Sequence, residues 1–217
     1  MGTITRSFAN NITTSGVLLP ASLNNNSIAN VTAYNAAIAT GNMVLISSQT
    51  ASNSASISFT SGIDSTYKEY QFWFIDIHPR TDAEEFQFNM STDAGSNYNV
   101  TKTTTFFDAY HNESDSSANI SYEAGEDLAQ STSFQTIMYN CGNGADENGC
   151  GTLQLFNPAS TIYVKHFIAN TQVHENTNYS INNYTAGYGN TTSAINAVQF
   201  KMSSGNFDGT ILLFGIK

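Results

Sequence analysis

The chain has 217 residues, with 7 Lys or Arg against 17 Asp or Glu and a formal net charge of −10. This negative balance argues against a nucleic-acid partner, because such proteins need Lys and Arg to replace the counterions around phosphates. A chain of this length can bury a core without a disulfide framework, and its two cysteines are too few to form one. Sandwiches and barrels of this size commonly fold as one unit, so one main domain is expected.

No stretch approaches the roughly 20 consecutive apolar residues that span a bilayer. The first residues, Met-Gly-Thr-Ile-Thr-Arg-Ser, lack the apolar segment of a signal peptide. We therefore expect synthesis in a cytoplasm and no membrane partner.

Residues 1–42 carry a single charged side chain and consist largely of Ala, Asn, Ser, Thr and scattered aliphatic residues. Such a segment has little reason to form a core of its own, so it is expected to be an N-terminal arm. Ile28, Val31, Asn35 and Ile38 fall at near-helical spacing, which favours one short helix within the arm. An extended segment is the alternative.

Residues 70–78 are the most apolar stretch of the chain. In a strand, alternate side chains point to opposite faces. One face would carry Trp73, Ile75 and Ile77, and the other would carry Tyr70, Phe72, Phe74 and Asp76. Both faces are mostly apolar, so this stretch is predicted to be the central strand of a β-sandwich, covered on both sides.

The rest of the chain beyond residue 43 repeats the same pattern of short apolar runs separated by turn residues. Further strands are expected at 43–48, 54–60, 85–90, 98–108, 134–139, 152–157, 161–170, 180–188, 194–203 and 210–216. The pattern predicts an all-β fold over residues 43–217, an antiparallel sandwich of roughly eight to ten strands.

Acidic residues gather between Lys102 and Lys165, where no Lys or Arg occurs. They are Asp108, Glu113, Asp115, Glu123, Glu126, Asp127, Asp146 and Glu147. One interpretation is a set of solvated loops that keep the protein soluble. The other is a set of oxygen ligands for calcium, although the spacing matches no known calcium loop. No other cofactor is expected.

The sequence motifs of the common enzyme classes are absent. Two carboxylates for glycoside hydrolysis could be drawn from the acidic residues, but any acidic loop would meet that condition. We expect that the protein is not an enzyme and that it has no catalytic residues.

Cys141 and Cys150 flank a loop rich in Gly, Asn and Asp, and a hairpin there would bring them together. A loop disulfide and a free pair of thiols are both compatible with the sequence. Zinc is disfavoured because the four histidines lie on four different expected elements, so the loop has no further ligands at the usual spacing.

Five tyrosines offer an exposed platform on which a sugar ring could stack, with ordinary packing as the alternative. They are Tyr110, Tyr122, Tyr179, Tyr184 and Tyr188.

Four stretches together carry a resemblance to a known group of proteins. They are Ile-Ser-Phe-Thr-Ser-Gly-Ile-Asp-Ser-Thr-Tyr at 57–67, Ile-His-Pro-Arg-Thr-Asp at 77–82, Ser-Thr-Asp-Ala-Gly-Ser-Asn-Tyr at 91–98, and Phe-Lys-Met-Ser-Ser-Gly-Asn-Phe-Asp-Gly-Thr-Ile-Leu-Leu-Phe-Gly-Ile-Lys at 200–217. Over residues 43–217 the chain resembles a group of small virion structural proteins of tailed phages that infect marine bacteria. The resemblance implies a jelly-roll-like sandwich on a phage particle, and it transfers no catalytic or binding residues.

From the resemblance and the sparsely charged arm we expect a virion structural protein that decorates the capsid surface and attaches partly through its arm. Its expected partners are other virion proteins, above all the major capsid protein, and further copies of itself in a homotrimer. It would be made in the host cytoplasm and would function in the virion. A tail or fibre component is the nearest alternative, and a carbohydrate-binding module that holds a host-surface glycan is the other.

Overall fold

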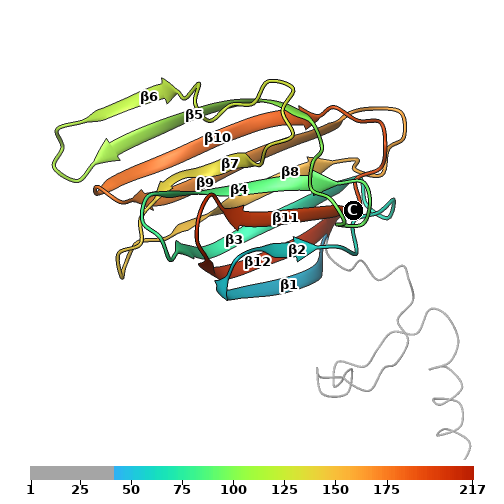
Figure 1. Ribbon diagram of the computed structural model, residues 1–217, viewed down its shortest axis with the longest axis horizontal. Helices are drawn as coiled ribbons and strands as arrows, with labels where there is room; N and C mark the ends of the chain where they lie inside the picture. The colour runs from blue at the N-terminus through green and yellow to red at the C-terminus, as the bar shows by residue number, and fades with distance from the viewer. Residues whose placement is uncertain (1–41) are drawn as a thin grey trace, which may run out of the picture. The chain divides into compact units, whose positions relative to one another are not determined.

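The computed structural model describes residues 42–217, which form twelve β-strands joined by turns and loops (Figure 1). The strands are β1 (Met43–Ser54), β2 (Ile57–Phe59), β3 (Glu69–Pro79), β4 (Glu84–Ser91), β5 (Lys102–Asn112), β6 (Ala118–Tyr122), β7 (Gln135–Cys141), β8 (Gly149–Phe156), β9 (Lys165–Glu175), β10 (Tyr179–Gly189), β11 (Ala197–Met202) and β12 (Phe207–Ile216). The predicted N-terminal arm and its helix fall on residues 1–41 and lie outside the described residues. Within residues 42–217, no helix has the length and apolar character needed to cross a bilayer.

The strands form two antiparallel layers. The large sheet has the order β1-β12-β3-β8-β9-β10-β5-β6, and the small sheet has the order β2-β11-β4-β7. A single residue pair, Cys141 with Glu175, connects β7, the edge strand of the small sheet, to the last residue of β9 in the large sheet.

The strand order is that of a jelly roll, because β1-β12-β3-β8 packs against β2-β11-β4-β7. The remaining strands, β9, β10, β5 and β6, extend the large sheet beyond the jelly roll (Figure 1). The predicted all-β, jelly-roll-like antiparallel sandwich is therefore confirmed. The strand number is twelve rather than eight to ten, since the extension adds strands to the eight of a jelly roll.

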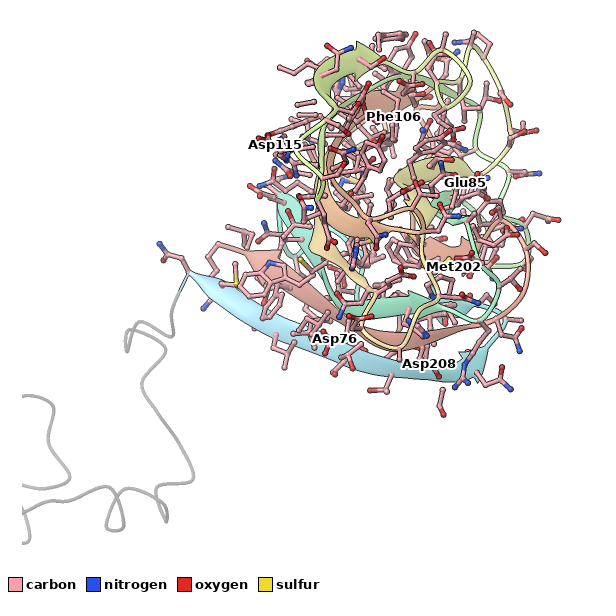
Figure 2. The ribbon with its side chains drawn as sticks, turned by 90° about the vertical axis from the view of Figure 1, so that its left-hand side faces the viewer. Asp76, Glu85, Phe106, Asp115, Met202 and Asp208 are labelled. Carbon is pink, nitrogen blue, oxygen red and sulfur yellow. The ribbon has the colours of Figure 1, made fainter. Side chains whose placement is uncertain are left out.

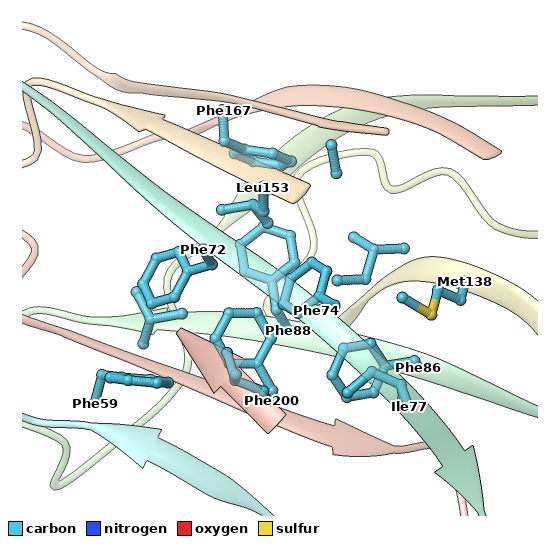
Figure 3. Packing of buried hydrophobic residues seen from close by; sticks show 14 of the residues in the cluster. Phe59, Phe72, Phe74, Ile77, Phe86, Phe88, Met138, Leu153, Phe167 and Phe200 are labelled. Carbon is cyan, nitrogen blue, oxygen red and sulfur yellow. The ribbon is translucent and has the colours of Figure 1, made fainter. Parts of the chain in front are cut away.

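Aromatic rings fill the space between the two sheets (Figure 3). Phe200 of β11 lies at the centre, with ring centroids 5.0 Å from Phe72 and 5.2 Å from Phe74 of β3. Phe86 of β4 stacks on Phe200 at 5.9 Å. Edge-to-face and stacked pairs of this kind add about 0.5–1.5 kcal/mol each to the free energy gained by burying the rings. The alternation of inward-facing Phe with outward-facing residues in β3 and β4 thus builds the core.

The prediction that residues 70–78 are covered on both faces is wrong. Trp73 is 37% exposed and Ile75 is 40% exposed. Asp76 forms a β-bulge with φ 52°, and the pairing with β8 skips from Phe74 to Ile77. The extra residue reverses the alternation, so Ile77 is buried with the core instead of lying beside Trp73.

Candidate functional site: an uncharged face on the large sheet

The side of the large sheet that points away from the small sheet carries several rows of side chains, and three neighbouring rows lie between the row of Glu69 and the row of His174. Each row can be followed from strand to strand because the register of the pairs is fixed. The first row is Leu45, Phe214, Gln71, Gln154, Ile168, Ala186 and Thr105. The second row is Ser48, Leu212, Trp73, Thr152, Asn170, Tyr184, Phe107 and Tyr122. The third row is Thr50, Thr210 and Ile75 on one side of the β3 bulge, and Cys150, Gln172, Asn182, Ala109 and Ile120 on the other.

None of the residues in these rows carries a formal charge, although the chain contains 17 Asp and Glu. We call these three rows the uncharged face. Charged residues lie at its margins: Asp76 and Asp208 lie near β1, and Asp115 lies at the opposite end of the described part (Figure 2). Arg80 pairs with Asp208 at 2.5 Å, which further reduces the charge at that margin.

The end of the uncharged face on β1, β12 and β3 is apolar. Leu45 is 54% exposed, and it lies in the same patch as the half-exposed Trp73 and Ile75. The ring of Phe214 packs against Trp73 with centroids 5.2 Å apart. Leu212 lies directly opposite Trp73 in the register. Soluble monomers rarely expose contiguous apolar side chains of this size without a binding role.

The other end of the uncharged face, on β10, β5 and β6, carries a row of aromatic rings. Tyr184, Phe107 and Tyr122 lie opposite one another on neighbouring strands. The rings of Phe107 and Tyr184 are parallel within 8°, with centroids 4.9 Å apart. At that spacing each ring covers part of one face of the other, so only the opposite face of each ring is open to a sugar. Phe107 was not among the predicted platform residues, and its only signal in the sequence is its alternation with the buried Phe106.

The five predicted platform tyrosines do not come together. Tyr122, Tyr184 and Tyr188 point outward, and Tyr188 lies beside His166 with ring centroids 6.1 Å apart. Tyr110 and Tyr179 point to the inner side of the large sheet, where they contact each other edge to face at 5.7 Å. A single platform of all five rings is therefore excluded by the alternation of the strands.

An acidic pocket lies on the inner side of β5 and β10. Its volume is about 280 Å³, and its lining includes Asp108, Glu123, Glu175 and Tyr139. Asp108 is only 3% exposed, and burial together with the nearby charge of Glu123 raises the pKa of its carboxyl to about 6. This pocket gathers part of the acidic stretch that the sequence analysis singled out.

Two buried oxygen atoms beside this pocket have no hydrogen-bond partner. They are Oδ1 of Asp108 and Oδ1 of Asn183, which lie opposite each other on β5 and β10. Two hydrogen-bond acceptors cannot bond to each other, but a protonated Asp108 can donate a hydrogen bond to Oδ1 of Asn183. The raised pKa and the pairing therefore both favour a neutral carboxyl at Asp108.

The acidic residues were also considered as ligands for a cation. No group of three or more His, Cys, Asp or Glu side chains in residues 42–217 is placed to hold a metal ion. His111 and His174 both line a groove of about 380 Å³ on the large sheet, but Ser180 of β10 lies between them in the register. Calcium binding by the acidic residues stays a prediction.

Both cysteines are free thiols. Cys141 is buried on β7, whereas Cys150 is exposed in the third row of the uncharged face. Burial raises the pKa of the Cys141 thiol to about 12, which keeps it protonated. Of the two alternatives left open by the sequence, the structure has the free pair rather than the loop disulfide.

Comparisons of the chain with protein-family models, with curated proteins and with solved structures found no match. The jelly-roll order alone does not decide the function, because capsid and lectin domains share it. The surface of the large sheet therefore carries the functional argument.

Proposed function

We propose that this protein is a non-enzymatic structural component of a larger particle and that it docks on a neighbouring protein through its uncharged face. The observation that carries the proposal is the absence of charge from three neighbouring rows of outward side chains. Covering such a face removes apolar surface from water without stripping water from an ion. The buried centres of protein interfaces are likewise depleted in charged residues and enriched in aromatic ones.

The particle that fits best is a phage virion, which is the setting implied by the sequence resemblance. The protein would decorate the capsid surface, with the major capsid protein and further copies of itself, in a trimer, as its neighbours. A place in the tail or its fibres is the nearest alternative. The acidic loops at the margins of the uncharged face would then stay in solvent and limit unwanted association.

Solution mass measurements test the docking role of the uncharged face. We expect the full chain to associate as its concentration rises, and we expect Trp73→Lys to weaken that association at least tenfold, because it places a charge in the apolar patch. Ile162→Lys is the matched control, since Ile162 is a 72% exposed apolar residue on a loop outside the face. A chain that stays monomeric at all concentrations, combined with intact particles that lack it, would contradict the proposal.

A second candidate function is weak binding of a neutral glycan by the middle of the same face. Asn182 donates to Asn170 at 2.8 Å, and these amides lie next to Tyr184. Neutral sugars need uncharged hydrogen-bonding groups beside an aromatic ring. Binding on a glycan array that is lost in Tyr184→Ala and kept in Tyr110→Ala would favour this candidate, because Tyr110 lies on the opposite side of the sheet. Binding that both variants keep would contradict it.

A further inference from the structure

Two lysines are fully buried in the sandwich, and their surroundings differ. Lys102 and Lys165 lie on either side of Gly189 in the register of the large sheet. Neither forms an ion pair with a carboxylate in residues 42–217. Lys165 donates only to backbone carbonyl groups. The Nζ of Lys102 donates instead to a side-chain amide, Oδ1 of Asn89, at 2.6 Å and to the carbonyl of Val100 at 2.9 Å.

The environment of Lys102 favours a neutral amine. Burial lowers the pKa of its amino group to about 7. A neutral amine has two N–H groups, which match its two acceptors, whereas an ammonium group has three. The remaining lone pair makes the neutral amine a nucleophile.

The side-chain amide of Asn89 is held in a fixed orientation. Its Nδ2 donates to the carbonyl groups of Tyr98 at 2.8 Å and Thr132 at 2.9 Å. Its Oδ1 accepts the backbone N–H of Met90 at 2.8 Å in addition to the Lys102 amine. A backbone N–H in this position stabilises negative charge that develops on the oxygen when the amide carbon is attacked.

The distance between the amine and the amide carbon is short. An amide C=O bond is about 1.2 Å long, so a nitrogen 2.6 Å from Oδ1 lies within about 3.8 Å of Cγ. Reacting atoms in enzymes are held about 3–3.5 Å apart, so a small rotation of the lysine side chain suffices for attack.

We propose that Lys102 and Asn89 form an intramolecular isopeptide bond in the folded protein. Nζ of Lys102 attacks Cγ of Asn89, a proton passes from Nζ to Nδ2, and the Cγ–Nδ2 bond breaks to release ammonia. The products are one new amide bond and one ammonia molecule, and no oxidant or reductant takes part. The bond would join β4 of the small sheet to β5 of the large sheet.

The surroundings also determine the rate that we expect. Among the described residues, no carboxylate forms a hydrogen bond or ion pair with either reacting group, so no side-chain acid assists the proton transfer. The reaction should therefore be slow and should speed up as the pH rises through 7, where more of the amine is neutral.

Intact-mass measurement of the full chain, incubated folded at pH 8, tests the proposal. Bond formation should lower the mass by about 17 Da, the mass of ammonia. Trypsin digestion then locates the change, because Lys102 is the only Lys or Arg between Arg80 and Lys165. The cross-linked chain should give one fragment, 81–165, whereas an unlinked chain should give 81–102 and 103–165.

Variants separate the cross-link from other reactions. Lys102→Met and Asn89→Ala should keep their full calculated masses, whereas Lys165→Met, the matched buried-lysine control, should still lose about 17 Da. Succinimide formation at Asn143-Gly144 or Asn148-Gly149 causes the same loss of mass but leaves Lys102 open to trypsin. Full mass and complete cleavage after Lys102 in the folded, incubated wild-type chain would overturn the proposal, whether or not the variants fold.

Discussion

Substitution of Asp108 by asparagine should change how the stability of the protein depends on pH. In the folded protein the pKa of Asp108 is raised from 3.8 to about 6, mainly by burial and also by the charge of Glu123. The folded state therefore holds this proton more tightly than the unfolded chain does. An asparagine cannot ionise, and its amide can donate a hydrogen bond to the unpaired Oδ1 of Asn183.

The direction and size of the effect follow from the two pKa values. The contribution of Asp108 to stability is complete below the unfolded pKa near 4, and it is lost as the pH rises through the folded pKa near 6. Each pKa unit corresponds to about 1.4 kcal/mol, so two units give an upper bound of about 3 kcal/mol. The adjacent pocket opens to solvent, which screens the charge, so we expect about 1–3 kcal/mol.

Urea denaturation of both proteins at pH 4.5 and pH 7.5 measures this effect. Asp108→Asn should be slightly more stable than the wild type at pH 4.5, where the wild type keeps most of this contribution, and should be clearly more stable than the wild type at pH 7.5. Asp93→Asn is the control, because hydrogen bonds from Ser91 and Asn97 lower the pKa of Asp93 to about 2 and stabilise its charged form. The control should lose stability at pH 7.5. If Asp108→Asn lowered the free energy of unfolding more at pH 7.5 than at pH 4.5, the reasoning would be refuted. That result would indicate that the charged carboxylate binds a cation.

Three other predictions concern the core, a close backbone contact and the thiols. Phe200→Ala should lower the free energy of unfolding by about 3–5 kcal/mol in denaturant titrations, since it removes the central ring, and a loss below about 1 kcal/mol would contradict the described core. Gly151→Ala should prevent folding or lower the thermal midpoint strongly, because φ is +150° and a Cβ would lie 2.5 Å from a backbone oxygen of β9. A Cβ at Gly125 would meet nothing within 4 Å, so Gly125→Ala should leave the thermal midpoint almost unchanged. Equal effects of Gly151→Ala and Gly125→Ala would contradict this account. A thiol reagent should modify Cys150 in the folded protein and Cys141 only after unfolding, and rapid modification of both would contradict the burial of Cys141.

The alternation of apolar and polar residues within each strand predicted the sandwich, because it indicates which side of the strand faces the core. It correctly places Phe72 and Phe74 together, but it cannot reveal the bulge at Asp76, which depends on the pairing of β3 with β8 and β12. Strand β6 was missed because it has only five residues and nearly all of its side chains are exposed, although Ala118, Ile120 and Tyr122 alternate with polar residues.

The candidate site was predictable only within single strands. Tyr184 and Tyr188 are four residues apart and share a face, whereas Tyr179 lies at an odd spacing from Tyr184 and takes the opposite face. The charge-free rows cross seven or eight strands, so their existence depends on registers that the sequence does not display. The contact between Lys102 and Asn89 likewise depends on how β4 and β5 are brought together.

Hydroxyl-radical footprinting tests the docking role of the uncharged face most directly. The protein would be labelled once as a dilute monomer and once at a concentration at which it associates, or within an intact particle. We expect labelling of Leu45, Trp73 and Phe214 to fall several-fold on association, while Ile162 and Tyr163 keep their labelling. Equal labelling of the three face residues in both states would contradict the account.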